Sequence, residues 1–171
     1  VDEVQTGFGR TGKLIACQHH GLCPDLLCLA KGMAGGVPMG AVLFGSRVDN
    51  ISPGVHGSTF GGNPLACAAG LAAIDYMIEH DLPGQAAVKG AGLMQRLAAI
   101  DSRLVREVRG LGLMIGIDLR QRVTPYLRAL MEEGVLALPA GSTVLRLLPP
   151  LVISDEELET VFAALKRVLT A

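Results

Sequence analysis

The first thirteen residues constrain the fold more than any other segment. Residues 2–6 mix acidic, apolar and polar side chains in the pattern of a β-strand that is ending, and Gly7, Gly9 and Gly12 then require a loop. The sequence therefore places Asp2 where a strand stops. In open α/β sheets, ligands bind outside the carboxyl ends of strands, so a carboxylate there can reach a bound cofactor. This segment predicts an α/β protein with a site at one sheet edge.

Lys31 is the second candidate site residue, because it is a single amine in an apolar, glycine-rich segment, residues 29–40. Burial disfavours the ammonium form of a lysine, and an amine that is less protonated can attack a carbonyl carbon to form a Schiff base. The alternative is a surface lysine whose aliphatic stem lies on apolar neighbours while its ammonium stays in water. This segment alone leaves both interpretations open.

Three long motifs in order resemble the class III pyridoxal-phosphate-dependent aminotransferases, the family that includes the acetylornithine and ornithine aminotransferases. They are residues 2–13, residues 29–41 around Lys31, and residues 56–64, which are His-Gly-Ser-Thr-Phe-Gly-Gly-Asn-Pro. The resemblance is strongest over residues 1–70 and covers nearly all of the chain. It implies fold type I of the pyridoxal-phosphate-dependent transferases. Residues 1–82 would be a remnant of the large domain with its mixed, largely parallel sheet, and residues 83–171 a small α+β carboxyl-terminal domain.

The resemblance also implies roles for individual residues. Lys31 matches the lysine that holds pyridoxal 5'-phosphate as a Schiff base, and Asp2 matches the acid that keeps the ring nitrogen protonated so that the ring accepts electrons. Arg146 matches the arginine that receives the substrate carboxylate, which a planar guanidinium can bind through two parallel hydrogen bonds. The other counterparts are Val4 on the ring face, Gln5 beside the ring hydroxyl, Ser58 near the substrate, and Thr59 at the cofactor phosphate, supplied across a homodimer interface.

The implied reaction moves an amino group from a carboxylate-bearing amine to 2-oxoglutarate. The motifs favour N-acetylornithine as the donor, in arginine biosynthesis. Ornithine, 4-aminobutyrate and carrier-linked lysine are alternative donors, and a racemase or aminomutase of the same fold is an alternative enzyme. Because the chain begins at Val1 within the strand expected to carry Asp2, we expect the carboxyl-terminal portion of a longer enzyme, inactive by itself.

Composition excludes several other classes of function. Half of the residues are hydrophobic and 18% are charged, which supplies a core and little solvated surface. Fifteen basic and 16 acidic residues, with 4% aromatics, give no basic stripe for nucleic acid. No apolar run is long enough to cross a bilayer, so we expect no membrane partner and a cytoplasmic enzyme.

Two further patterns resemble binding sites. Gly7, Gly9 and Gly12 have the spacing of a dinucleotide-binding fingerprint, but the next segment is too short for the helix that such a site requires, which favours a tight loop near the cofactor. His19 and His20 lie near two cysteines without a zinc-site spacing, which favours an ordinary loop and no metal. The four cysteines are expected to be reduced core thiols: Cys17, Cys23, Cys28 and Cys67.

The remaining sequence predicts the scaffold. Asn63 as N-cap and Pro64 in the first turn start a helix that ends near His80 and is apolar on nearly every side, as in a buried helix. Ser154 and Glu157 form a capping box for the last helix, which has one apolar face. Between them we expect a break at residues 81–84, a helix over 85–100, a hairpin of 105–108 and 112–119 around Gly110, a helix over 124–133, and strands over 135–138 and 144–148.

Overall fold

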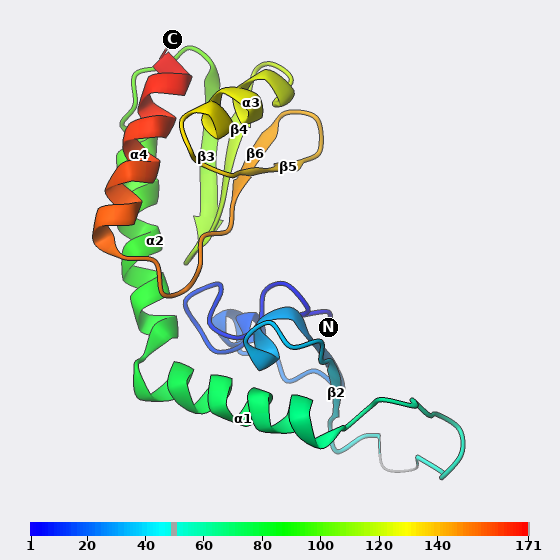
Figure 1. Ribbon diagram of the computed structural model, residues 1–171. Coiled ribbons are helices and arrows are strands. Elements are labelled where there is room, and N and C mark those ends of the chain that lie inside the picture. Colours follow the sequence, from blue (N-terminus) through cyan, green and yellow to red (C-terminus); the bar gives the residue numbers. More distant parts are fainter. Residues whose placement is uncertain (49–50, 171) are drawn as a thin grey trace. The chain divides into compact units, whose positions relative to one another are not determined.

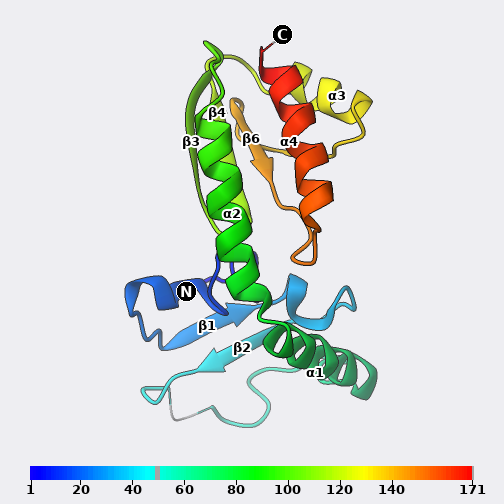
Figure 2. The ribbon, with the colours of Figure 1, turned by 90° about the vertical axis from the view of Figure 1, so that its left-hand side faces the viewer.

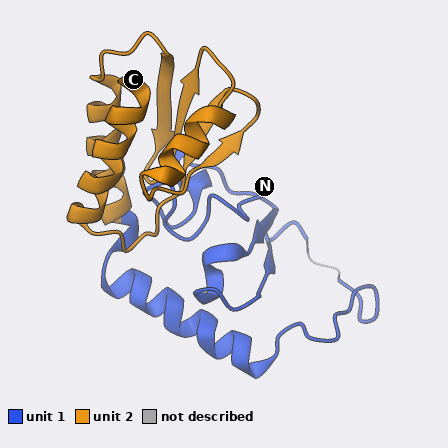
Figure 3. Ribbon diagram, turned by 45° about the horizontal axis from the view of Figure 1, so that its top comes forward, with its two compact units in different colours: residues 1–83 blue, residues 84–171 orange. Residues whose placement is uncertain are grey.

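The computed structural model of the protein describes residues 1–48 and 51–170, and the chain divides into two compact units, Val1–Pro83 and Gly84–Ala171 (Figure 3). Both combine helices with a small sheet, as the α/β prediction requires. That they correspond to a large-domain remnant over 1–82 and a small domain over 83–171 remains a prediction. Over the described ranges, none of the helices has both the length and the apolar character needed to span a bilayer.

The first unit is built on a small mixed sheet. Strand β1 (Leu26–Leu29) pairs antiparallel with β2 (Ala41–Phe44), and Leu29 lies opposite Ala41. The amino-terminal segment runs parallel to β1 through a bridge between Asp2 and Cys28. Two short 3-10 helices follow the loops, η1 (Ala16–His20) and η2 (Lys31–Ala34) (Figure 1). The amino-terminal segment and β1 therefore end at the same sheet edge.

Helix α1 (Pro64–Glu79) starts as predicted, because the Asn63 side chain accepts a hydrogen bond of 2.9 Å from the Ala66 amide and Pro64 occupies the first turn. The prediction that α1 is a buried helix is wrong for the residues that the structure describes. The buried positions are Ala66, Gly70 and Met77, which form one narrow face, and the helix packs on η2. Large apolar side chains on its other sides face solvent because one neighbouring element covers only one stripe of a helix. They include Leu65, Leu71 and Ile78.

The second unit contains an antiparallel sheet with the strand order β3-β4-β6-β5. The predicted hairpin is confirmed as β3 (Val105–Leu111) and β4 (Met114–Leu119), but its turn lies at residues 112–113. Gly110 instead pairs with Ile115 inside the ladder. Strand β5 (Leu138–Ala140) begins three residues later than expected, and β6 (Val144–Leu147) follows the prediction closely.

Helices α2 (Leu82–Ala98) and α4 (Asp155–Thr170) lie side by side, and α3 (Thr124–Glu132) completes the unit (Figures 1 and 2). The predicted break at residues 81–84 is wrong after Asp81, since Pro83 and Gly84 lie in the first turn of α2. A proline is tolerated there because the first amides of a helix have no carbonyl partner. The capping box of α4 is confirmed: the Ser154 amide donates to Glu157 at 2.7 Å, and the Glu157 amide donates to Ser154 Oγ at 3.1 Å.

The main core lies within the second unit. Helix α4 contributes Leu158, Leu165, Val168 and Leu169, which are buried on the predicted apolar face. The facing side chains come from the inward face of β4 and β6, from the turn before β4, and from the helices α2 and α3. They include Leu93, Leu97, Leu113, Ile115, Ile117, Leu119, Leu130, Leu145 and Leu147. This core closes one side of the sheet.

Candidate functional site

The structure brings Asp2 and Lys31 to one edge of the mixed sheet. Asp2 bridges Cys28, with the Glu3 amide donating to the Cys28 carbonyl at 2.9 Å and the Cys28 amide donating to the Val1 carbonyl at 3.0 Å. Lys31 follows two residues after the end of β1. Since the two segments run parallel there, Asp2 and Lys31 come from neighbouring segments near the carboxyl end of β1, and ligands bind at such strand ends in α/β sheets.

Lys31 itself has an unusual backbone. Its φ of 47° lies in the left-handed region, which a residue with a Cβ seldom adopts. Lys31 opens η2 directly after Ala30, and its side chain is exposed in this chain. In this chain the Lys31 side chain therefore matches the alternative interpretation, a lysine exposed at the surface. Strained backbone conformations are concentrated at functional sites, because the surrounding structure must enforce them.

Val4 and Gln5 follow Asp2 into a turn, and both side chains are half-buried. Asp2 Oδ1 accepts a hydrogen bond of 2.9 Å from the Val4 amide, so the carboxylate is tied to the start of that turn. Gly7 closes the turn against the sheet, and its amide donates to the Glu3 carbonyl at 3.0 Å. A Cβ on Gly7 would lie 2.9 Å from that oxygen, so a side chain does not fit. The loop predicted around these glycines is thus packed tightly on the strand.

Glu3 is a polar residue of this region that the sequence did not single out. Its side chain is 1% exposed, although it stands between two predicted cofactor contacts. Burial alone would raise the pKa of Glu3, but hydrogen bonds from the amides of Ala16 and Cys17 and from the Thr6 hydroxyl outweigh burial and hold the pKa below its ordinary value. The partners are up to fourteen residues away in the chain, and no local pattern marks them.

The segment after these glycines supports neither a dinucleotide-binding site nor a metal site. Residues 16–20 form the short 3-10 helix η1, in place of the amphipathic helix that a dinucleotide fingerprint needs. The His19 ring contacts the Thr11 carbonyl at 3.0 Å. Within residues 1–48 and 51–170, no three His, Cys, Asp or Glu side chains form a group that could hold a metal ion. The cysteines are free as expected, but Cys23 is exposed and so is no core thiol.

Ser58 and Thr59 lie on the exposed segment before α1. Ser58 lines a pocket of about 470 Å³ together with Pro38, Met39 and Gly40 of the lysine-bearing segment. Asn63 and Ala66, at the start of α1, also line this pocket. Two of the three motifs therefore meet in it. The first amides of a helix and its dipole favour an anion, which suits a phosphate near this end of α1.

Arg146 belongs to the second unit, in the middle of β6. It is half-buried and lies between Gly116 of β4 and Leu138 of β5 in the register of the sheet. Gly116 has no side chain on this row, and a Cβ there would lie 3.3 Å from Val144 Cγ1. The guanidinium is held on a rigid strand, which suits the directional recognition of a carboxylate.

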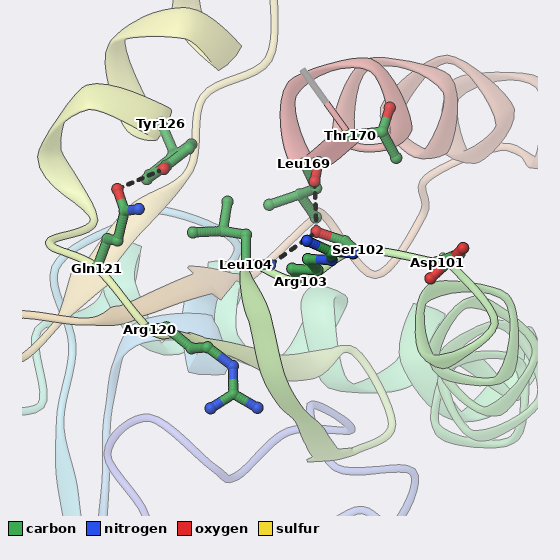
Figure 4. A pocket seen from close by; sticks show the side chains of 9 residues that line it. All are labelled: Asp101, Ser102, Arg103, Leu104, Arg120, Gln121, Tyr126, Leu169 and Thr170. Atoms are coloured by element: carbon green, nitrogen blue, oxygen red, sulfur yellow. Dashed lines mark hydrogen bonds between the residues drawn. The ribbon is translucent and has the colours of Figure 1, made fainter.

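A pocket of about 510 Å³ in the second unit contains none of the predicted site residues (Figure 4). The Ser102 hydroxyl donates to the Leu169 carbonyl at 2.5 Å, and the Tyr126 hydroxyl donates to Gln121 at 3.0 Å. These contacts join the chain ends of β3, β4, α3 and α4. We therefore assign this pocket a structural role.

The donor set of the first unit fits pyridoxal phosphate. An amine can bind the aldehyde, a carboxylate can pair with the ring nitrogen, and hydroxyls beside a helix start can bind the phosphate, which are the three polar groups by which this cofactor is held. Lys31 and Asp2 supply the amine and the carboxylate, and Thr59, on the segment before α1, has the hydroxyl that the resemblance assigns to the phosphate.

Comparison with known proteins gives consistent matches. The family model described as "Aminotransferase class-III" matches residues 1–169. The chain is 52% identical over 171 residues to a LysW-aminoadipate semialdehyde transaminase of Deinococcus radiodurans, covering 99% of this chain and 40% of that protein. It is 46% identical over 170 residues to ornithine aminotransferase 2 of Staphylococcus aureus, covering 98% of this chain and 43% of that protein.

Solved structures agree with the sequence matches. An acetylornithine aminotransferase from Elizabethkingia anophelis matches with a TM-score of 0.91 and 40% identity, over 98% of this chain and 44% of that one. An ornithine aminotransferase from Toxoplasma gondii matches with a TM-score of 0.94 and 37% identity, over 99% of this chain and 42% of that one. The chain thus spans less than half the length of each of these proteins.

Proposed function

Because the chain belongs to the class III aminotransferase family, we propose that it is part of an enzyme that moves an amino group from a carboxylate-bearing amine to 2-oxoglutarate. Class III aminotransferases are pyridoxal-phosphate enzymes of fold type I, and the fold predicted from the sequence is confirmed by the matches to solved structures. One observation carries the proposal: Asp2, which pairs in parallel with Cys28 of β1, and Lys31, two residues after the end of β1, come from neighbouring parallel segments, and Lys31 has a strained backbone.

The proposed chemistry divides among the residues of this chain. Pyridoxal phosphate, when bound, supplies an electron sink. Lys31 provides the amine for its attachment and, once released, the base that moves a proton at the substrate carbon. Asp2 holds a proton on the ring nitrogen, and Val4 and Gln5 fix the plane of the ring. Arg146 orients the substrate through its carboxylate.

Ser58 and Thr59 complete the proposed assembly. We place Ser58 near the substrate, and Thr59 at the cofactor phosphate of the second subunit in a homodimer. The exposure of both residues in the single chain supports this, since a residue that serves a neighbouring subunit must reach beyond its own. Ser58 also lines the pocket beside the lysine-bearing segment.

N-acetylornithine is the donor that we propose first, because the motifs favour it and an acetylornithine aminotransferase is among the structural matches. A carrier-linked lysine derivative is the second candidate, favoured by the relative with 52% identity. Comparing kcat/KM for N-acetylornithine, ornithine, 4-aminobutyrate and the carrier-linked substrate, each with 2-oxoglutarate, separates them. Conversion of a donor without any keto acid would favour a racemase or aminomutase instead.

We propose that the 171-residue chain has no transaminase activity by itself, since more than half the length of its relatives lies outside the matched region. An active form for testing is a hybrid enzyme, in which residues 1–171 replace the matching part of the Deinococcus radiodurans relative. Turnover by the hybrid enzyme, with none by the chain alone, is the expected result. Turnover by the chain alone would refute this part of the proposal.

The choice of lysine can be tested by reduction with borohydride in the presence of pyridoxal phosphate. The chain has four lysines, Lys13, Lys31, Lys89 and Lys166, so peptide mapping identifies the labelled one. In the hybrid enzyme we expect label on Lys31, and Lys31→Ala should remove it and reduce turnover by about 10⁴-fold. Lys13→Ala is the matched control, because Lys13 is an exposed lysine of the neighbouring motif. If peptides from residues 1–171 still carry the label in the Lys31→Ala variant, another lysine of this chain binds the cofactor.

A further inference from the structure

The Glu3 carboxylate is buried at the point where the site residues begin. Its side chain is 1% exposed, while Asp2 before it is exposed and Val4 after it is half-buried. An ionised carboxylate is seldom buried unless hydrogen bonds satisfy its oxygens. A buried carboxylate such as that of Glu3 therefore needs hydrogen-bond donors placed around its oxygens.

Both carboxylate oxygens of Glu3 bind the distant end of the following loop. Oε1 accepts from the Cys17 amide at 2.6 Å, and Oε2 accepts from the Ala16 amide at 2.7 Å and from the Thr6 hydroxyl at 3.0 Å. The two amides lie thirteen and fourteen residues further along the chain. One side chain thus fastens both the beginning and the end of the loop over residues 4–17.

The backbone of Glu3 is fixed as well. Its amide donates to the Cys28 carbonyl of β1 at 2.9 Å, and its carbonyl accepts from the Gly7 amide at 3.0 Å. A Cβ on Gly7 would also lie 3.1 Å from Leu29 Cδ2, so the turn packs closely on β1 only because position 7 has no side chain. Glu3 is therefore the junction between β1, the first turn and the far end of the loop.

The charge state of Glu3 suits this role. The amide and hydroxyl donors favour the ionised form, and they outweigh burial, so the pKa of Glu3 lies below its ordinary value. An ionised carboxylate has only acceptor sites and can receive several donors at once. A glutamine side chain has one acceptor oxygen in place of two, so its NH₂ group would face at least one of the remaining N–H donors.

We infer that Glu3 is a positioning residue for the proposed cofactor site: it locks the loop over residues 4–17 so that Asp2, Val4 and Gln5 hold the pyridine ring. This inference rests on the proposed function. It differs from a general stabilising role because the affected property is the geometry of the ring contacts. Small displacements of groups that orient a reacting molecule reduce rates strongly.

Glu3→Gln and Thr6→Val test the inference in the hybrid enzyme. Thr6→Val removes one donor to Oε2 and serves where Glu3→Gln folds poorly. For Glu3→Gln we expect the Kd for pyridoxal phosphate, measured by absorbance titration, to rise by about tenfold or more and kcat to fall by a similar factor, with the donor KM little changed. Thr6→Val should change the same quantities in the same direction by less.

Ser154→Ala is the matched control, because it removes a polar hydrogen bond of α4, far along the chain from the loop. It should lower the midpoint of thermal unfolding without changing the Kd for the cofactor. Amide hydrogen exchange of the 171-residue chain gives a second measure that needs no cofactor: the Ala16 and Cys17 amides should exchange faster in Glu3→Gln and unchanged in Ser154→Ala.

The outcomes separate the two proposals. If the unmodified hybrid enzyme fails to bind pyridoxal phosphate, the proposed function fails, whatever Glu3 does. If it binds the cofactor and Glu3→Gln and Thr6→Val lower only the unfolding midpoint, with Kd and kcat as in the unmodified protein, the positioning role is overturned.

Discussion

The two units of this chain are stabilised in different ways. The large buried cluster lies entirely within the second unit, from Ala86 to Leu169. The first unit exposes more of its large apolar side chains than the second, with Phe60 at 81% and Leu71 at 66%, and buries the carboxylate of Glu3. The second unit therefore has the interior of an independent domain. The first is held by hydrogen bonds around its site residues and presents apolar surface for further protein to cover.

The largest difference should come from removing a leucine side chain from a helix in each unit. Leu165 of α4 is 0% exposed and Leu71 of α1 is 66% exposed. Leu165→Ala leaves a cavity in a closed core and should lower the free energy of unfolding by about 2–5 kcal/mol. Leu71→Ala should change it by less than about 0.5 kcal/mol. Urea unfolding of the 171-residue chain, followed by circular dichroism, measures both, and equal losses would contradict the comparison.

A smaller effect should follow from adding one methyl group inside α2. A Cβ on Gly90 would lie 1.9 Å from the carbonyl oxygen of Gly112 in the hairpin turn, whereas a Cβ on Gly92 meets nothing within 4 Å. Gly90→Ala must push the helix off the hairpin and should cost about 1–3 kcal/mol or more. Gly92→Ala should stabilise the chain by up to about 1 kcal/mol, because alanine favours a helix more than glycine does. The same unfolding assay checks both, and a loss in Gly92→Ala as large as in Gly90→Ala would show that the space around each glycine is not what separates them.

Acid should weaken the first unit through Glu3. The pKa of Glu3 in the folded chain lies below the ordinary value of 4.5, so the unfolded chain binds this proton more readily. The stabilisation is complete above pH 4.5 and is lost as the pH falls through the lower folded value. Exchange protection of the Ala16 and Cys17 amides should fall over that acid range. In Glu3→Gln this acid-dependent fall should disappear; if it persists unchanged, another group causes it.

Features fixed by neighbouring residues could be predicted from the sequence. Local signals were sufficient for α1, with Asn63 and Pro64 at its start, and for α4, with its capping box, because the responsible residues are within one turn of each other. The hairpin was also predicted, but its turn was placed at Gly110. A glycine marks a turn only where the backbone needs it, and here Gly112, with φ 53°, adopts the left-handed conformation.

Long-range contacts account for what was missed. Nothing near Glu3 in the sequence marks the amides thirteen and fourteen residues away that bury it. The start of α2 was missed because Pro83 and Gly84 usually interrupt helices, although a proline fits a first turn. The motifs identified the edge that carries Asp2 and Lys31, but periodicity could not predict that α1 would expose most of its apolar surface. That exposure depends on which elements are present to cover it.

The smallest expected effect compares the two helix caps. Ser154→Ala removes the hydrogen bond that caps α4 and should lower the free energy of unfolding by about 1 kcal/mol, because α4 is part of the closed core and unfolds with it. Asn63→Ala removes the corresponding cap of α1, which packs along a single face, so the change should be confined to faster exchange in the first turn of α1. Ser142→Ala, at an exposed loop residue, is the control for both and should change neither measurement. A loss of global stability in Asn63→Ala as large as in Ser154→Ala would mean that the two units unfold as one.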